Sequence, residues 1–209
     1  MGGSALESTL RGGAEPVRLI ETLLWDGAAY PRQAGHLARL VRSAAALGFL
    51  CDPAAVLAAL PRPEGPARVR LTLGAGGDSE VTVAPLPPAA PQWRLKLAAP
   101  RLDSADPWLR VKSTRRAVYD AARAALPPGT EELIFCNERD EVCEGTITNL
   151  FFDRGHGMRT PPLSSGLLPG VLRAELALPE EPLLRADLPH VRLWVGNALR
   201  GLIPAVWLG

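Results

Sequence analysis

The stretch Glu131–Phe152, EELIFCNERDEVCEGTITNLFF, contributes most to the prediction of the fold. An apolar run at 132–137 predicts a strand, the polar turn NERDE follows, and a second apolar run at 149–153 predicts another strand. Glu144 lies between these runs, where an ionised carboxylate without a partner would cost several kcal/mol. We therefore expect Glu144 either to pair with a buried group, such as a ring nitrogen that becomes protonated, or to face solvent in a turn.

The flanking sequence predicts a mixture of strands and helices. Strands are expected at 17–25, 69–73, 80–83, 93–98 and 193–196, and helices at 37–49, 53–60, 117–125 and 166–178. This pattern indicates an α+β fold of mostly antiparallel strands with segregated helices. The stretch LPPAAP at 86–91 is the best linker candidate, because proline cannot donate to a strand ladder. It separates a small lobe at 17–86, preceded by a flexible tail at 1–16, from a larger lobe at 92–209.

The composition is that of an ordinary globular protein. The chain has 209 residues, of which 47% are hydrophobic and 22% charged, with a net charge of +1. This balance gives no electrostatic support for a nucleic-acid-binding or anionic-membrane surface. No apolar run reaches the roughly 20 residues that a membrane span needs, and the N-terminus lacks the apolar core of a signal peptide. We expect a soluble cytoplasmic protein that binds neither nucleic acid nor membrane.

The cysteines and histidines do not form a metal-binding pattern. Cys51, Cys136 and Cys143 are far apart, no CxxC pair exists, and the three histidines do not cluster. An odd number of scattered cysteines is no disulfide framework either. We expect three reduced thiols that pack as small hydrophobic side chains, and no metal site.

Lysine is scarce in this chain. Of the 23 basic residues, only Lys96 and Lys112 are lysine, and the other 21 are arginine. Arginine replaces lysine on a solvated surface, but it cannot lose a proton near neutral pH and act as a nucleophile. If the protein uses a side-chain amine, these two lysines are the candidates. Lys112 either forms a Schiff base in a site that lowers its pKa, or is an exposed lysine in a basic run with Arg115 and Arg116.

Three further segments are candidates for binding an anion. Gly170 stands at an expected helix start, where the free backbone amides of Val171 and Leu172 would attract a phosphate. Most such helix starts bind nothing, so this signal is weak on its own. Arg39, on an expected helix, either reaches the same phosphate or lies on the surface. A polar loop at 196–198 stands between two apolar segments.

Together, five stretches resemble the class IV pyridoxal-phosphate-dependent enzymes, the group of branched-chain aminotransferase, D-amino-acid aminotransferase and 4-amino-4-deoxychorismate lyase. They are LIETLLWDGAAYPRQAGHLARLVRSAAALGF, VKSTRRAVYDAA, EELIFCNERDEVCEGTITNLFF, TPPLSSGLLPGVLR and VGNALRGLIPA. These stretches follow the family's order and cover most of residues 17–204. The resemblance implies a two-lobed fold of type IV, like that of D-amino-acid aminotransferase, in which the larger lobe binds the cofactor.

The resemblance also implies roles for individual residues. Lys112 would hold pyridoxal 5'-phosphate as a Schiff base and move the α-proton, and Glu144 would pair with the pyridine nitrogen. The residues implied at the phosphate are Arg39 of the HxxRL helix, the backbone amides of Val171 and Leu172, and the loop residues Asn197 and Ala198. Thr22 and Arg116 are expected to contact the substrate, and the alternative for Arg116 is a surface or inter-subunit role.

The same resemblance favours one reaction among three. The K-S-T-R-R-x-x-Y and NERDEVCEGT runs look most like lyases that convert 4-amino-4-deoxychorismate into 4-aminobenzoate, a folate precursor, and pyruvate. One alternative is an aminotransferase that acts on branched-chain or D-amino acids. The other is a family member that binds the cofactor but is catalytically altered, because the family's first strand and YGDG-like stretch are absent before RLIET at 18–22.

The resemblance further implies a homodimer and a functional partnership with aminodeoxychorismate synthase. A missing N-terminal strand leaves a sheet edge exposed unless something covers it. Trp25 and Trp93 lie in expected strands where one face must be buried. We expect the N-terminal lobe of one subunit to help close the pocket that holds Lys112 of the other, with closed two-fold symmetry.

Overall fold

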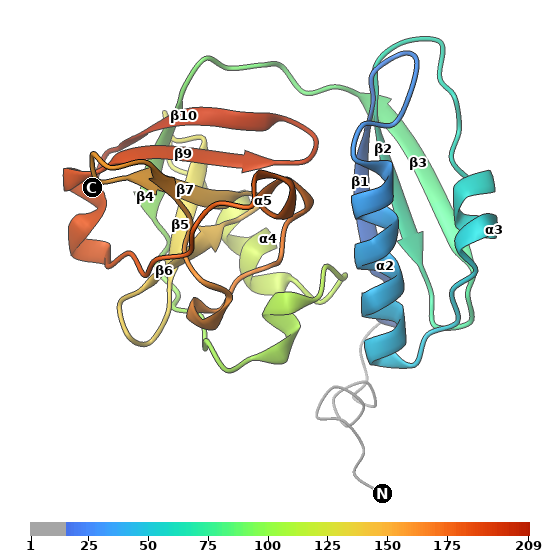
Figure 1. Ribbon diagram of the computed structural model, residues 1–209, viewed down its shortest axis with the longest axis horizontal. Helices are drawn as coiled ribbons and strands as arrows, with labels where there is room; N and C mark the ends of the chain where they lie inside the picture. Colours follow the sequence, from blue (N-terminus) through green and yellow to red (C-terminus); the bar gives the residue numbers. More distant parts are fainter. Residues whose placement is uncertain (1–15) are drawn as a thin grey trace, which may run out of the picture. The chain divides into compact units, whose positions relative to one another are not determined.

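The computed structural model describes residues 16–209, and Figure 1 shows their helices and strands. The chain divides into two compact units. The first unit contains the residues up to Pro88 and Val111–Arg115, and the second contains Ala89–Arg110 and Arg116–Gly209. The break at Pro88 lies within the stretch proposed as a linker, whereas the expected lobes did not separate residues 111–115 from their neighbours. The expected tail lies, apart from Pro16, outside the described residues.

The first unit is a three-stranded antiparallel sheet with two helices. Its elements are β1 (Leu19–Trp25), α2 (Gln33–Leu47), α3 (Pro53–Ala58), β2 (Ala67–Leu73) and β3 (Ser79–Pro85). The strands lie in the order β1-β2-β3, and α2 packs on β1 (Figure 1). Apolar residues three and four apart on α2, namely Leu40, Ala44 and Leu47, are buried as the helical period requires. Asp52 caps α3, because its carboxylate accepts from the Ala54 amide at 2.9 Å.

The second unit is built on a seven-stranded mixed sheet. Its strands are β4 (Trp93–Leu97), β5 (Glu132–Cys136), β6 (Val142–Gly145), β7 (Asn149–Asp153), β8 (Met158–Arg159), β9 (Arg192–Asn197) and β10 (Gly201–Trp207). Its helices are α4 (Ala117–Ala124) and α5 (Val171–Leu176), with 3₁₀ turns η1 (Pro107–Arg110), η2 (Leu163–Ser165) and η3 (Arg185–His190). The strand order is β6-β5-β4-β10-β9-β7-β8, and β6 also pairs with β7. This extra pair closes six of the strands into a ring.

Strand β5 shows how the core of the second unit is arranged. Ile134 and Cys136 belong to one buried apolar cluster, with residues of β4, β7, β9 and β10. Leu133 and Phe135 point to the opposite face and belong to a second cluster, which includes Ala122 of α4. Because both faces are covered, all five residues of β5 are buried, which explains its uninterrupted apolar sequence.

Two expectations about the C-terminal half are wrong. The strand at 193–196 was expected to be the last, but β10 follows it, and Pro204 lies within β10. The pairing of β10 with β4 begins only at Ala205, so the missing amide of Pro204 removes no bond on that side. The helix expected at 166–178 is confined to Val171–Leu176, because the residue before Pro169 is held out of the helical region.

The described part of the chain contains no helix long and apolar enough to cross a membrane. Within that same part, no three histidine, cysteine or acidic side chains lie close enough together to hold a metal ion. Cys136 and Cys143 are buried, and burial raises the pKa of both thiols, that of Cys136 to about 11. Cys51 is partly exposed and unpaired with another cysteine. The cysteines are therefore free thiols, two of which pack in the core.

Candidate active site

Glu144 lies in β6, and its side chain is buried at 6% exposure. Its Oε1 accepts a hydrogen bond from the Tyr119 phenol at 2.8 Å, and its Oε2 lies 3.4 Å from Nδ2 of Asn149. Tyr119 comes from α4, and Asn149 is the residue of β7 that pairs with Glu144 across the sheet. The alternative that Glu144 faces solvent is therefore wrong. Its pairing with a cofactor ring remains a prediction.

Asn149 connects Glu144 to the start of α5. Besides facing Glu144, its Nδ2 donates to the carbonyl of Leu168 at 2.9 Å. A Cβ at Gly170 would come within 1.9 Å of the Asn149 Oδ1, so only glycine allows this approach. Gly170 is the N-cap of α5, and the amides of Val171 and Leu172 stand in its first turn, where they have no intrahelical acceptor. Sequence reasoning missed Asn149, although a polar residue opening an apolar strand was a usable signal.

The loop that follows β9 lies beside the same helix. The Asn197 Oδ1 accepts from the backbone amides of Leu199 and Arg200 at 3.1 and 3.0 Å, and its Nδ2 donates to the Ile147 carbonyl at 3.1 Å. A Cβ at Gly196 would lie 2.8 Å from a methyl group of Leu172. The structure therefore brings the first turn of α5 and the turn after Asn197 together in the second unit, and Ala198 is buried within that turn.

A second buried carboxylate, that of Glu132, fixes the turn that joins Glu144 to Asn149. Glu132 is completely buried. It accepts from the backbone amides of Thr146 and Ile147 at 3.0 and 3.2 Å, from the Thr146 hydroxyl, and from the Thr148 hydroxyl at 2.9 Å. With so many donors, Glu132 is a structural anchor of the turn at 146–148, and no sequence pattern indicated this role.

Arg116 makes contacts within the second unit. Its Nε donates to Asp120, one helical turn further along α4, at 2.8 Å, and its Nη2 donates to the Thr146 carbonyl at 3.1 Å. These bonds tie α4 to the turn that Glu132 also holds. They give Arg116 a structural role inside the second unit, and both its contact with a substrate and an inter-subunit role remain predictions.

Arg39 is buried in the first unit, at 5% exposure, so the alternative that it lies on the surface is wrong. Its Nε and Nη2 donate to both carboxylate oxygens of Glu21, at 2.8 and 2.5 Å, and His36 Nδ1 lies 2.7 Å from Glu21 Oε2. Burial raises the pKa of Glu21, but Arg39 and His36 together outweigh it and hold the pKa below its ordinary value. Among the described residues, no acceptor contacts Nη1 of Arg39, which is therefore free for a further anion.

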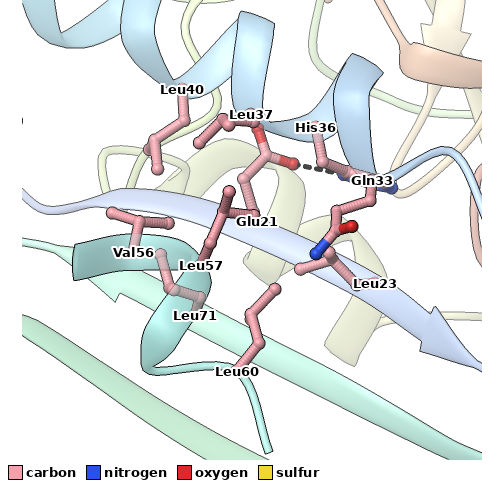
Figure 2. Close-up of a pocket in the computed structure, with 10 residues that line it drawn as sticks. All are labelled: Glu21, Leu23, Gln33, His36, Leu37, Leu40, Val56, Leu57, Leu60 and Leu71. Carbon is pink, nitrogen blue, oxygen red and sulfur yellow. Dashed lines mark hydrogen bonds and ion pairs between the residues drawn. The ribbon is translucent and has the colours of Figure 1, made fainter. Parts of the chain in front are cut away.

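Figure 2 shows Glu21 reaching from β1 to His36 on α2, beside a small apolar pocket. The pocket, of about 260 Å³ including open solvent, is lined by Glu21, Leu23, Gln33, His36, Leu37, Leu40, Val56, Leu57, Leu60 and Leu71. Seven of these ten residues are leucine or valine, and the other three are Glu21, Gln33 and His36. Among the described residues, Nε2 of His36 is buried and has no hydrogen-bond partner.

Lys112 belongs to the first unit, because its segment runs along the start of β1. The Lys112 carbonyl accepts from the Ile20 amide at 2.8 Å, and the Thr114 amide donates to the Arg18 carbonyl at 2.9 Å. The backbone of Lys112 therefore lies beside Ile20 of β1. Thr22, which is half-buried, follows two residues later on the same strand. Lys96 lies in β4 of the second unit. The structure thus groups Lys112, Thr22 and Arg39 in one unit and the other expected site residues in the other.

Comparisons with known proteins address the family directly. The model of a family described as amino-transferase class IV matches residues 18–206. A Schizosaccharomyces pombe protein named "Putative aminodeoxychorismate lyase" is 30% identical over 171 residues, which are 78% of this chain and 74% of that protein. The crystal structure of a "Putative amino-acid aminotransferase" from Mesorhizobium loti is 46% identical, covers 92% of this chain and 100% of its own, and has a TM-score of 0.86.

A crystal structure of 4-amino-4-deoxychorismate lyase from Pseudomonas aeruginosa shares the fold, with a TM-score of 0.80 at 23% identity over 91% of this chain and 83% of its own. These findings confirm the resemblance seen in the sequence and the expected α+β fold of type IV. Because the family model spans nearly all described residues, this chain belongs to the class IV aminotransferases, the pyridoxal-phosphate-dependent enzymes that include aminotransferases and aminodeoxychorismate lyases.

Proposed function

We propose that this chain binds pyridoxal 5'-phosphate and is a lyase that converts 4-amino-4-deoxychorismate into 4-aminobenzoate and pyruvate. The observation that carries the proposal is the buried Glu144, which Asn149 links to the first turn of α5. A carboxylate suits the protonated nitrogen of a pyridine ring, and the amides of a helix start suit a phosphate. Both groups occur in the second unit, and the relative named as a lyase supports the reaction.

The residues present fit the cofactor chemically. Gly170 lets Asn149 reach the start of α5, beside the amides of Val171 and Leu172, and Arg39 has a guanidinium nitrogen available for a phosphate oxygen. Val171, Leu172, Asn197 and Ala198 would contribute to the same phosphate. Lys112 supplies the amine that holds the cofactor aldehyde. When bound, the cofactor supplies an electron sink for negative charge on the carbon that carries the substrate amine.

In the proposed reaction, Lys112 moves a proton and Glu144 maintains the electron sink. The Lys112 amine removes the proton from the substrate carbon that bears nitrogen. The bond between the neighbouring carbon and the enolpyruvyl oxygen then breaks, the ring becomes aromatic, and the released enolpyruvate takes up a proton to become pyruvate. Glu144 keeps a negative charge at the ring nitrogen throughout. Thr22 and Arg116 are proposed to orient the substrate carboxylates.

An aminotransferase acting on branched-chain or D-amino acids is the second candidate function. It is favoured by the relative from Mesorhizobium loti, which is named as a putative amino-acid aminotransferase. The match with this chain covers the whole length of that relative. The same residues would hold the cofactor, and Lys112 would move the proton without departure of a β-substituent from the substrate. Nothing in the groups around Glu144 distinguishes these two outcomes, because the choice depends on how the substrate is held.

A two-step experiment tests the proposed function. Purified protein is mixed with pyridoxal phosphate, and an absorbance band near the visible edge that borohydride removes is the expected result. The loaded enzyme is then given 4-amino-4-deoxychorismate or a panel of amino acids with a keto acid. Release of 4-aminobenzoate supports the lyase, and keto-acid formation without 4-aminobenzoate supports the aminotransferase. A protein that shows the band but neither product is a catalytically altered family member.

We also propose that the enzyme works as a homodimer and uses the product of aminodeoxychorismate synthase as its substrate. The support is the closed two-fold symmetry common to soluble oligomers and the dependence of the lyase on that synthase for substrate. We expect light scattering across a dilution series to give twice the chain mass of 22.3 kDa. A mass near 22.3 kDa at micromolar concentration, with activity intact, would contradict the dimer.

A further inference from the structure

We propose that Tyr119 is a positioning residue that holds the Glu144 carboxylate in its working orientation. The inference rests on the proposed function, in which Glu144 faces the cofactor ring. Its basis is the 2.8 Å hydrogen bond from the Tyr119 phenol to Glu144 Oε1, which is shorter than the 3.4 Å separation between Glu144 Oε2 and Asn149. The shorter bond fixes which carboxylate oxygen points to α4 and therefore how the carboxylate plane is turned.

The Tyr119 ring is itself held in place by its neighbours. Phe135, fully buried on β5, meets it edge to face with ring centroids 5.0 Å apart. The Arg116 guanidinium lies 5.7 Å from the centre of the same ring. Because α4 is also tied to the turn at 146–148 through Arg116, the phenol oxygen has little freedom to leave Glu144. The hydroxyl is therefore a preorganised donor.

Tyr119 is the hydrogen-bond donor of the pair. Burial raises the pKa of Tyr119 far above its ordinary value, and the neighbouring Glu144 carboxylate raises it further. The Tyr119 phenol therefore donates and the Glu144 carboxylate accepts. The bond thereby orients the Glu144 carboxylate through a fixed donor.

The kinetic experiment compares Tyr119→Phe with Tyr30→Phe, since the chain has two tyrosines. Tyr30 is the matched control because its phenol donates to a backbone carbonyl, that of Pro61, in the first unit. In the loaded enzyme we expect Tyr119→Phe to lower kcat about tenfold, with KM changed less than about twofold, because a charge-assisted bond is lost away from the substrate. Tyr30→Phe is expected to retain the wild-type kcat.

A double-mutant comparison separates positioning from general damage. In a Glu144→Gln background, Tyr119→Phe is expected to lower kcat by less than about twofold, because the carboxylate to which Tyr119 donates is already absent. An equal loss of kcat in both backgrounds would show a merely structural role and overturn the proposal. An unchanged kcat in Tyr119→Phe, measured in an enzyme that makes product, would overturn it as well.

A spectroscopic measurement on the cofactor-free protein does not depend on the reaction. The phenol carbon of each tyrosine is labelled with ¹³C, and Tyr30→Phe identifies which signal belongs to Tyr119. We expect Glu144→Gln to shift the Tyr119 signal and to leave the Tyr30 signal unmoved. An unchanged chemical shift of the Tyr119 signal in Glu144→Gln overturns the proposal. Since no activity is measured, the outcome stands whether or not the proposed reaction is correct.

Discussion

Glu21 in the first unit and Glu144 in the second are both buried glutamates within apolar strands, yet their surroundings differ. Glu21 is 3% exposed and Glu144 is 6% exposed. Glu21 is bonded to the guanidinium of Arg39 and faces His36, so a cation lies against it. At Glu144 the Tyr119 phenol donates a hydrogen bond, and the Asn149 carboxamide faces the other carboxylate oxygen.

This difference indicates different tasks. A carboxylate bonded by a guanidinium has its charge offset, so Glu21 serves to orient Arg39 and to keep that cation buried. The phenol of Tyr119 fixes the direction of the Glu144 carboxylate through a hydrogen bond. Glu144 is proposed to face a cationic ring nitrogen, whereas Glu21 supports the arginine proposed at the phosphate.

The largest expected effect on folding comes from Glu21→Gln. It leaves Arg39 buried without its anionic partner, and we expect a loss of about 3–5 kcal/mol in the free energy of unfolding. Urea unfolding at neutral pH measures it. Glu80→Gln is the matched control, because Glu80 is exposed and lies 3.5 Å from Arg18, and its stability should be nearly that of the wild type. Equal stability of the two variants would contradict the role of Glu21 as the anionic partner of the buried Arg39.

Glu144→Gln is expected to act on catalysis more than on folding. The electron sink loses its charged partner while the groups proposed at the phosphate stay intact, so we expect kcat to fall about 10²-fold with cofactor retention nearly unchanged. Equilibrium dialysis of the cofactor and steady-state assays measure the two quantities. Unchanged turnover, with Glu80→Gln as the reference, would remove Glu144 from the catalytic machinery.

A smaller effect concerns pH. Glu21 has a lowered pKa in the folded protein, so its contribution to stability is complete above the ordinary value of 4.5 and is lost as the pH falls through the folded value. We expect wild-type stability to decline more steeply than that of Glu21→Gln between pH 5 and about pH 3. Urea midpoints at several pH values test this, and parallel declines would be incompatible with it.

The sequence was sufficient to predict local strands and helices, and to nominate site residues within the stretches that resemble the family. The strand at Leu19–Trp25 and the helix at Pro53–Ala58 lie within the ranges expected from the sequence, 17–25 and 53–60. The sequence was insufficient to predict elements that depend on which strands pair with each other. Strand β10 contains Pro204, which argues against a strand unless one knows that only β9 pairs at that position.

The partners of the candidate site were hidden for the same reason. Tyr119 stands 25 residues before Glu144, and Glu132 contacts a turn 14 to 16 residues further on. No local pattern shows that these groups meet, because their contact depends on how α4, β5 and β6 pack. Glu144 itself was recognisable as an acid in an apolar setting, although the same reasoning applied to Glu21 and was not extended to it.

The central claim is that Lys112 holds pyridoxal phosphate, and peptide mapping tests it most directly. The loaded protein is treated with borohydride, which fixes the cofactor to its amine, and is then digested with trypsin and examined by mass spectrometry. We predict the added pyridoxyl mass on the peptide Val111–Arg115, and no such label in Lys112→Ala, whose turnover should fall at least about 10³-fold. A label on Lys96, or an unlabelled protein that retains full activity, would contradict the claim.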